Sequence, residues 1–352
     1  MLSQLRLHNF RCFDTLHTPI HPGTTLIIGD NAQGKTTLLE AICVLLRLQS
    51  PRTPRPAELI RHTQHSFGIA GHWNGQQLKH LHAQGIRTLA LNGTPTTRTA
   101  DYLAASGLLV WMGNNDLELI TGTSEPRRRY LDFLGTQLFP EYRPALLRYD
   151  KALKTRNHLL KHHPSPPWPQ IDAYTTILAH NAHLLTDLRT QLLTALSPHA
   201  TAAHHHISSA TETLTLHYHS TSGPDLTATL RTLREQETHR RTTLAGPHRD
   251  DLHLHLNTHP ATTYASEGQQ RTLALALKLS QATLLTSHHG QPPLLLLDDI
   301  FGELDPPRRH ALLTALPPDS QRIITTTHLH WLTEHPTPHT LLHLTQGQLH
   351  PA

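Results

Sequence analysis

The sequence predicts an α/β protein in which a mainly helical lobe is inserted into a lobe built on a mixed sheet. Three observations support this: apolar strands and a glycine-rich loop near the N-terminus, helical periodicity in the middle, and apolar strands again near the C-terminus. An insertion into one folded lobe is the simplest explanation of that order. We therefore expect an N-terminal part over residues 1–114, a helical insertion over 115–239 and a C-terminal part over 240–352.

The N-terminal part is expected to begin with a strand, because Leu5 and Leu7 alternate with polar residues. Short alternating runs over 67–91 predict an antiparallel meander, with Asn92-Gly93 as a hairpin turn. Residues 108–112 predict a further strand.

Helical periodicity replaces this pattern over 127–139, 142–163 and 171–196, and the proline-rich segment 164–169 separates the last two helices. Alternation and apolar runs then return. They predict strands over 214–219, 251–256, 294–297 and 322–326, and a helix over 273–285.

Composition restricts the class of protein. No run of 18 apolar residues occurs, so no membrane span is expected. The two cysteines, Cys12 and Cys43, do not make a disulfide framework and fit a reducing cytoplasm. A formal charge of +4 permits nucleic-acid binding without demonstrating it.

Histidine is unusually common, with 33 residues that include the run His204-His205-His206. The histidines are scattered and are not combined with cysteines in the spacing of a structural metal site. We therefore interpret their abundance as compositional drift. A His-rich metal-binding protein is an alternative, but it leaves the motifs described next unexplained.

Residues 29–37 read G-x-x-x-x-G-K-T-T, the pattern of a phosphate-binding loop. A short apolar strand precedes the loop and apolar residues at helical spacing follow it, which is the context the motif requires. Backbone N–H groups and a helix N-terminus can surround phosphate oxygens. Lys35 can reach the outer phosphates, and the Thr36 hydroxyl can bind Mg²⁺. The expected nucleotide-binding residues are Asp30, Asn31, Ala32, Gln33, Gly34, Lys35, Thr36 and Thr37.

Two carboxylates, Asp298 and Asp299, follow the four leucines of 294–297. Ligands bind at the carboxyl ends of such buried parallel strands. We expect Asp298 to bind Mg²⁺ and Asp299 to orient or deprotonate a water molecule. A solvated acidic cap is the alternative, and the phosphate-binding loop makes it the weaker one.

A second anion-seeking helix N-terminus is expected near Ser266, which is a good N-cap residue before the apolar helix. Gly268 allows close approach of the backbone. Plain helix capping is the alternative explanation of this segment.

These motifs resemble those of ABC-type ATPases. Ser266, Gly268 and Gln269 look like the signature motif, Asp305 lies in a segment similar to the D-loop, and His328 resembles the switch histidine. More closely, the chain resembles the RecF family of bacterial recombination mediators, which is related to SMC heads. The matching segments are 9–11, 29–37, 127–132, 246–251, 265–272 and 298–305.

The resemblance implies an ABC-type P-loop ATPase head with ATP and Mg²⁺ as cofactors. It implies an ATP-dependent homodimer in which Ser266, Gly268 and Gln269 of one protomer face the nucleotide held by Lys35 of the other. Catalysis would involve Lys35, Asp299 and His328, with slow, DNA-stimulated hydrolysis. The family implies work on duplex DNA and single-stranded/double-stranded junctions, with RecO and RecR, to load RecA.

The DNA-binding candidates are basic residues in two clusters: Arg52, Arg55 and Arg61, and Lys151, Lys154 and Lys161. Residues 127–129 are three arginines that can instead tie the lobes together. The chain departs from the family at Asn114-Asn115-Asp116, where a Pro-Glu-Asp pattern is more usual, and has Asp299 where transporter ATPases carry glutamate.

A transporter ATPase subunit is the alternative function. A long helical segment separates Lys35 from Ser266, whereas transporter subunits resemble one another in having a much shorter gap. A small-molecule kinase is less compatible still, because it needs no signature helix.

Overall fold

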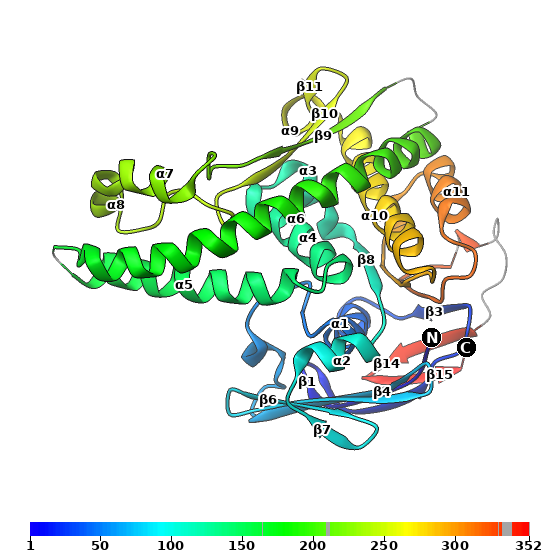
Figure 1. The fold of residues 1–352 in the computed structure, drawn as a ribbon. Coiled ribbons are helices and arrows are strands. Elements are labelled where there is room, and N and C mark those ends of the chain that lie inside the picture. The colour runs from blue at the N-terminus through cyan, green and yellow to red at the C-terminus, as the bar shows by residue number, and fades with distance from the viewer. Residues whose placement is uncertain (164, 209–211, 330, 333–339, 352) are drawn as a thin grey trace. The chain divides into compact units, whose positions relative to one another are not determined.

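The computed structural model describes residues 1–163, 165–208, 212–329, 331–332 and 340–351. The chain divides into two compact units (Figure 1). Unit 1 comprises residues 1–116 and 281–352, and unit 2 comprises residues 117–280.

The division differs from the predicted one at its second boundary, which lies after residue 280 rather than at residue 240. The reason is strand pairing. β10 (Asp251–Leu256) pairs antiparallel with β9 (Leu214–His219), so the segment that follows residue 240 belongs to the folded unit that contains β9.

One sheet of unit 1 joins the two ends of the chain in the order β15-β14-β3-β13-β12-β8. All neighbours are parallel except β15, which pairs antiparallel with β14, so the sheet is mixed. β12 is an interior strand, between β13 and the edge strand β8, and its four leucines are almost fully buried. The strands are β3 (Thr24–Ile28), β8 (Leu109–Gly113), β12 (Leu294–Asp298), β13 (Arg322–Thr326), β14 (Thr340–Thr345) and β15 (Gln348–Pro351).

A second sheet of unit 1 is antiparallel, in the order β2-β1-β4-β5-β6-β7. It confirms the predicted meander, and Asn92 and Gly93 both have positive φ, as a tight two-residue hairpin turn requires. The strands are β1 (Leu2–Phe10), β2 (Phe13–Pro19), β4 (Ser66–Trp73), β5 (Gln76–Ala83), β6 (Ile86–Leu91) and β7 (Thr94–Thr96).

Helix α1 (Lys35–Arg47) lies between these sheets, contacting β8, β12 and β13 of the first and β1, β4 and β5 of the second. It is therefore buried around nearly its whole circumference, because a sheet covers each side of it. The shorter helices of unit 1 are η1 (Pro56–Leu59), α2 (Thr99–Ala105), η2 (Asn114–Leu117), η3 (Phe301–Glu303) and α11 (Pro306–Ala315).

Unit 2 is mainly helical, and α5 (Tyr142–His162) and α6 (Trp168–Ser208) run along each other (Figure 1). Helix α6 extends beyond the predicted end at Leu196 and contains Pro198 within it. The other elements are α3 (Glu118–Thr121), α4 (Ser124–Leu138), β9, α7 (Leu226–Thr232), α8 (Arg234–Arg240), β10, β11 (His259–Pro260), α9 (Ala261–Tyr264) and α10 (Glu267–His289), whose C-terminal turns belong to unit 1.

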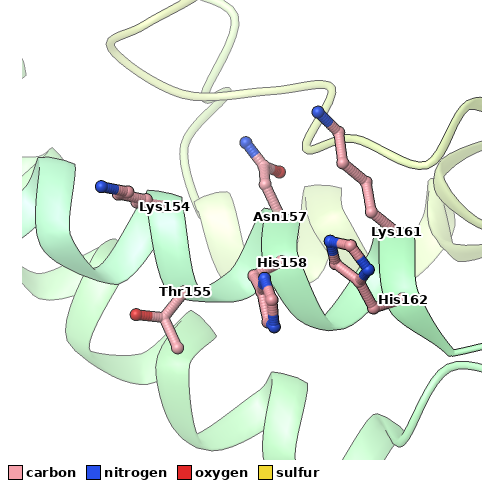
Figure 2. Close-up of a pocket in the computed structure, with 6 residues that line it drawn as sticks. All are labelled: Lys154, Thr155, Asn157, His158, Lys161 and His162. Carbon is pink, nitrogen blue, oxygen red and sulfur yellow. The ribbon is translucent and has the colours of Figure 1, made fainter.

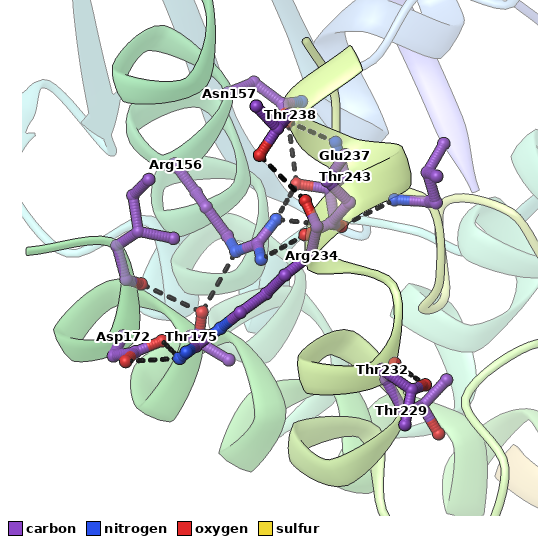
Figure 3. A network of polar contacts seen from close by, with 12 residues as sticks. Arg156, Asn157, Asp172, Thr175, Thr229, Thr232, Arg234, Glu237, Thr238 and Thr243 are labelled. Carbon is purple, nitrogen blue, oxygen red and sulfur yellow. Dashed lines mark hydrogen bonds and ion pairs between the residues drawn. The ribbon is translucent and has the colours of Figure 1, made fainter. Parts of the chain in front are cut away.

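A buried ion pair holds three segments of unit 2 together (Figure 3). Arg156 of α5 donates two hydrogen bonds to the Glu237 carboxylate of α8, at 3.1 and 2.6 Å. It also donates to the hydroxyls of Thr175 on α6, at 3.0 Å, and Thr243, at 2.8 Å. The side chains of Arg156 and Glu237 are 1% and 0% exposed, so each charge depends on the other for compensation.

Removing one partner should destabilise unit 2. Glu237→Gln leaves the Arg156 charge buried without its carboxylate, which typically costs about 3–5 kcal/mol. We expect a clearly lower thermal unfolding midpoint by calorimetry. The matched control is Asp172→Asn, since Asp172 and Arg234 form a carboxylate–guanidinium pair that is about half exposed and should contribute no more than about 1 kcal/mol. Equal midpoints for the two variants would contradict the role of the buried pair.

Candidate functional site

The backbone of the glycine loop has a conformation that its sequence favours. Gly34 has φ +103° and precedes α1, and Ala32 also has positive φ. A Cβ on Gly34 would lie 2.9 Å from Cys12 Sγ, and one on Gly29 would lie 2.6 Å from the Leu344 carbonyl oxygen. Glycine at both positions therefore lets the loop close against its neighbours.

Lys35 begins α1 and folds back over the loop, with 6% of the residue exposed. Its ammonium donates to the carbonyl oxygens of Gly29, at 2.5 Å, and Asp30, at 3.0 Å. Burial lowers the pKa of Lys35, and the charges of Asp299, Asp298 and Asp30 oppose that shift. The cation is thus held at the loop by backbone oxygens and nearby carboxylates.

Asp298, at the end of β12, lies beside the first turn of α1. Its Oδ1 accepts hydrogen bonds from the hydroxyls of Thr325, at 2.8 Å, and Thr36, at 3.1 Å. Burial raises the pKa of Asp298, the two hydroxyls oppose the shift, and the Asp299 carboxylate reinforces it. The structure therefore places together the two residues that the sequence predicts as Mg²⁺ ligands.

Asp299 follows with left-handed backbone, at φ +52°. Its N–H donates to the carbonyl oxygen and the hydroxyl of Thr325, both at 3.1 Å. Its charge acts on both Lys35 and Asp298. The predicted catalytic carboxylate is therefore next to the predicted metal ligand, at the carboxyl edge of the parallel sheet.

The other predicted residues of unit 1 have local roles. Asp116 Oδ2 accepts from the Gly113 N–H at 2.8 Å, which folds the segment after β8. Gln33 Oε1 accepts from the Gln346 N–H at 2.9 Å. The His328 backbone is bonded to the Thr326 hydroxyl after β13. Asp305 is the N-cap of α11, accepting from the Arg308 N–H at 2.9 Å.

The predicted signature residues of unit 2 form a capping box at the start of α10. The Ser266 N–H donates to Gln269 Oε1 at 2.7 Å, and the Gln269 N–H donates to Ser266 Oγ at 3.4 Å. Gln269 also donates to Glu212 at 2.5 Å. Ser266 is exposed at this helix N-terminus.

Sequence reasoning missed a buried carboxylate beside the loop. Glu40 of α1 is 0% exposed and accepts from Arg11, at 2.5 and 2.8 Å, from Ser50, at 2.5 Å, and from Arg52, at 3.4 Å. A glutamate inside an otherwise apolar helix was the signal that could have revealed it, because a buried carboxylate needs a cationic partner. Arg52, a predicted DNA contact, is thus already paired with the Glu40 carboxylate.

The other DNA-binding candidates lie on the surface. Arg55 pairs with Glu58 at 3.4 Å and Arg61 with Asp14 at 3.6 Å. Lys151, Lys154 and Lys161 are exposed on α5. Lys154 and Lys161 also line an open hollow of about 570 Å³ (Figure 2). The other lining residues are Thr155, Asn157, His158 and His162.

The arginines at 127–129 act inside unit 2. Arg127 donates to both oxygens of Asp251, at 2.7 and 2.8 Å, and so binds α4 to the start of β10. Arg128 donates to the Asp250 carbonyl oxygen at 3.0 Å, and Arg129 pairs with Glu125. Arg127 and Arg128 therefore stabilise the packing of α4 against β10.

Known proteins resemble the chain over nearly its full length. A family model described as an AAA domain matches residues 4–97. The DNA replication and repair protein RecF of Thermosynechococcus vestitus is 39% identical, over 93% of this chain and 91% of the relative. The chain belongs to the RecF family. The RecF protein of Halalkalibacterium halodurans is 36% identical, over 93% of both chains. This membership confirms the resemblance inferred from the motifs and favours a DNA replication and repair protein over a transporter subunit.

Solved structures agree with the family. A structure of the recombination mediator protein RecF-ATP in the RecFOR pathway has a TM-score of 0.88 and 28% identity, covering 100% of this chain and 97% of the other. An Smc head bound to the C-winged helix domain of ScpA has a TM-score of 0.54 at 14% identity, a likeness of fold alone. The fold is therefore that of an α/β ABC-type ATPase head with mixed sheets and helical regions. Among the helices described, none combines the length and hydropathy that crossing a membrane requires.

Neutralising Asp298 should stabilise the ligand-free protein. Its folded pKa is raised above 3.8, so its stabilising contribution is complete below pH 3.8 and is lost as the pH rises through the folded pKa. At pH 7 the ionised carboxylate therefore lowers the free energy of unfolding. Asp298→Asn keeps an acceptor oxygen and should raise the Tm at pH 7 in buffer with a chelator.

The difference in Tm between Asp298→Asn and the wild type should become smaller as the pH is lowered through the raised pKa of Asp298 towards 3.8. Thr325→Val is the matched control, since it removes a hydroxyl that stabilises the charged form and should lower the Tm at pH 7. A lower Tm for Asp298→Asn at pH 7 would overturn this account of the carboxylate.

Proposed function

We propose that this protein is an ATP-dependent DNA-binding repair protein that closes as a homodimer on duplex DNA. The observation that carries the proposal is the pairing of Thr36 with Asp298, 3.1 Å apart, beside a glycine loop closed by Lys35. It is supported by relatives named DNA replication and repair protein and by the similar fold of the RecF-ATP structure.

The residues of the loop fit ATP and Mg²⁺. The positive φ of Gly34 and the close neighbours of Gly29 and Gly34 let the loop take a tight conformation, the kind of backbone whose N–H groups can surround an anion. The Thr36 hydroxyl and the Asp298 carboxylate are oxygen donors, which Mg²⁺ prefers. When bound, ATP with Mg²⁺ supplies the phosphoanhydride bond that is cleaved.

Each residue then has a distinct role. Lys35 would hold the outer phosphate oxygens, while Thr36 and Asp298 would hold the metal ion. Asp299 would orient the attacking water and accept its proton, and His328 would assist from the segment after β13. The remaining loop residues, from Asp30 to Thr37, surround the phosphates mainly through backbone N–H groups.

DNA affinity would come mainly from arginine and lysine contacts to phosphates, so it would fall steeply with salt and depend little on sequence. The exposed lysines of α5 are our first candidates, because Lys151, Lys154 and Lys161 lie on one helix and pair with no carboxylate among the residues that the structure describes. Arg55, Arg61 and Arg52 come second, since each is paired with a carboxylate. Single-stranded/double-stranded junctions, RecR and RecO are the partners that family membership favours, with RecA loading as the outcome. Hydrolysis would be slow and stimulated by DNA.

Lys35→Ala should remove most ATP affinity, because it deletes the cation of a site that is otherwise built from backbone. Lys35→Arg keeps the charge but changes its shape, and should impair hydrolysis more than binding. Isothermal titration with ATP and Mg²⁺ measures both variants. ATP binding by Lys35→Ala at wild-type affinity would contradict the assignment of this loop as the ATP site.

Asp299→Asn should separate binding from hydrolysis. The variant keeps Asp298 for the metal and loses a base, so we expect ATP to bind while turnover falls by about a hundredfold or more. Phosphate release under single-turnover conditions is the measurement. Unchanged turnover would assign the base elsewhere, with Asp116 and His328 next to be tested.

The signature residues would complete the site in trans. Ser266, Gly268 and Gln269 open α10, whose N-terminus favours an anion, and Asp305 would lie near the same dimer interface. Two such contacts related by a two-fold axis make a closed dimer with two shared nucleotides. ATP then favours the dimer because only the dimer makes the signature contacts.

Ser266→Arg should bind ATP as a monomer, fail to dimerise and lose ATP-dependent retention on DNA. Light scattering with and without ATP measures whether the variant dimerises. Mixing Ser266→Arg with Lys35→Ala chains places both lesions in one shared site and leaves the other intact, so some ATPase activity should return. Full ATP-driven dimerisation and ATPase activity by Ser266→Arg alone would refute the shared site.

A further inference from the structure

Four histidines gather on one face of the β9–β10 ribbon in unit 2. His217 and His219 of β9 are exposed, as is His253 of β10, and His255 is partly exposed. In the antiparallel register His217 lies opposite His253. The leucines that alternate with the histidines on β10 are buried, so the four imidazoles share the solvent-facing side of both strands.

The imidazoles form two cross-strand pairs. The ring centroids of His217 and His255 are 5.3 Å apart, and those of His219 and His253 are 5.4 Å apart. With Zn–N bonds of about 2.1 Å in tetrahedral geometry, two imidazoles on one ion have centroids about 5 Å apart. The ring planes of His217 and His255 meet at 75°, whereas those of His219 and His253 are stacked at 9°, so binding one ion requires the side chains of the second pair to change rotamer.

We propose that this face, the histidine quartet of His217, His219, His253 and His255, binds a divalent transition-metal cation such as Zn²⁺ through these cross-strand pairs. Within the described ranges of the chain, no group of three or more metal-ligating side chains is preassembled. In this proposal each ion takes two imidazoles from one cross-strand pair and completes its shell with water. Neutral imidazole suits zinc, copper and nickel, whereas Mg²⁺ prefers oxygen ligands.

The surrounding charges favour the quartet over another histidine pair. The Asp251 carboxylate, which pairs with Arg127, lies 3.6 Å from His253 Nε2, so the quartet has a carboxylate oxygen nearby and no lysine on its two strands. On α5, His158 and His162 have ring centroids 4.3 Å apart. Exposed Lys154 and Lys161 lie on the same stretch of that helix, and their charges oppose the approach of a dication.

The test is a calorimetric Zn²⁺ titration of the full chain in buffer that contains excess Mg²⁺. The quartet variant His217→Gln/His253→Gln removes one imidazole from each pair, and its fold is checked by circular dichroism. We expect its Zn²⁺ affinity at the strongest class of sites to fall by about tenfold or more, because chelation is lost. A Zn²⁺-dependent rise in Tm should shrink in parallel, since binding to the folded state stabilises it.

The matched control is His158→Gln/His162→Gln, which removes two exposed histidines from a helix in the same unit and should leave the strongest Zn²⁺ sites unchanged. The single variants His219→Gln and His255→Gln should each weaken one pair, which tests the pairing if the double variant folds poorly. Wild-type Zn²⁺ affinity in the quartet variant, or loss of the strongest sites in the α5 control, would overturn the proposal.

Discussion

Parallel pairing between strands from opposite ends of the chain is the constraint on which the phosphate-loop site depends. β3 pairs with β13 and β13 pairs with β12, so the residues that follow these strands meet at one edge of the sheet. The hydrogen bond from Thr36 to Asp298 spans that edge. Helix α1 is enclosed between two sheets. Its first residues, Lys35 and Thr36, are therefore held at this edge of the sheet.

Much of the fold could be predicted because its strongest elements carry local signals. The leucine run of β12, the alternation of β4 to β6 and the long apolar periodicity of α10 are each visible within one short window. β14 and β15 were missed because their alternation is weak and β15 is exposed at the sheet edge. The second unit boundary was missed because it depends on the pairing of β9 with β10, a contact distant in sequence that no local pattern reports.

In the candidate site, too, what local motifs define could be predicted from the sequence, whereas the buried partners of single charged residues could not. The meeting of the glycine loop with the paired aspartates was predictable, since spacing and flanking strands define both segments. The contacts of Glu40 and Arg127 were not, because a charged residue in sequence does not reveal whether it faces solvent or a buried partner. In unit 2 the fully buried Arg189 likewise donates to Asp132 at 2.7 Å and to the Pro247 carbonyl oxygen at 2.8 Å. Many arginines of this chain are thus structural, which narrows the surface available for DNA to exposed lysines and a few arginines.

The left-handed backbone at Asp299 limits which residues natural variation can place there. At φ +52°, asparagine, aspartate and glycine are tolerated best, whereas a longer or β-branched side chain is strained. A glutamate at position 299 would meet more of that backbone cost than the aspartate does. The short side chain therefore suits the turn after β12, and a longer acid at this position would favour a different turn at the end of that strand.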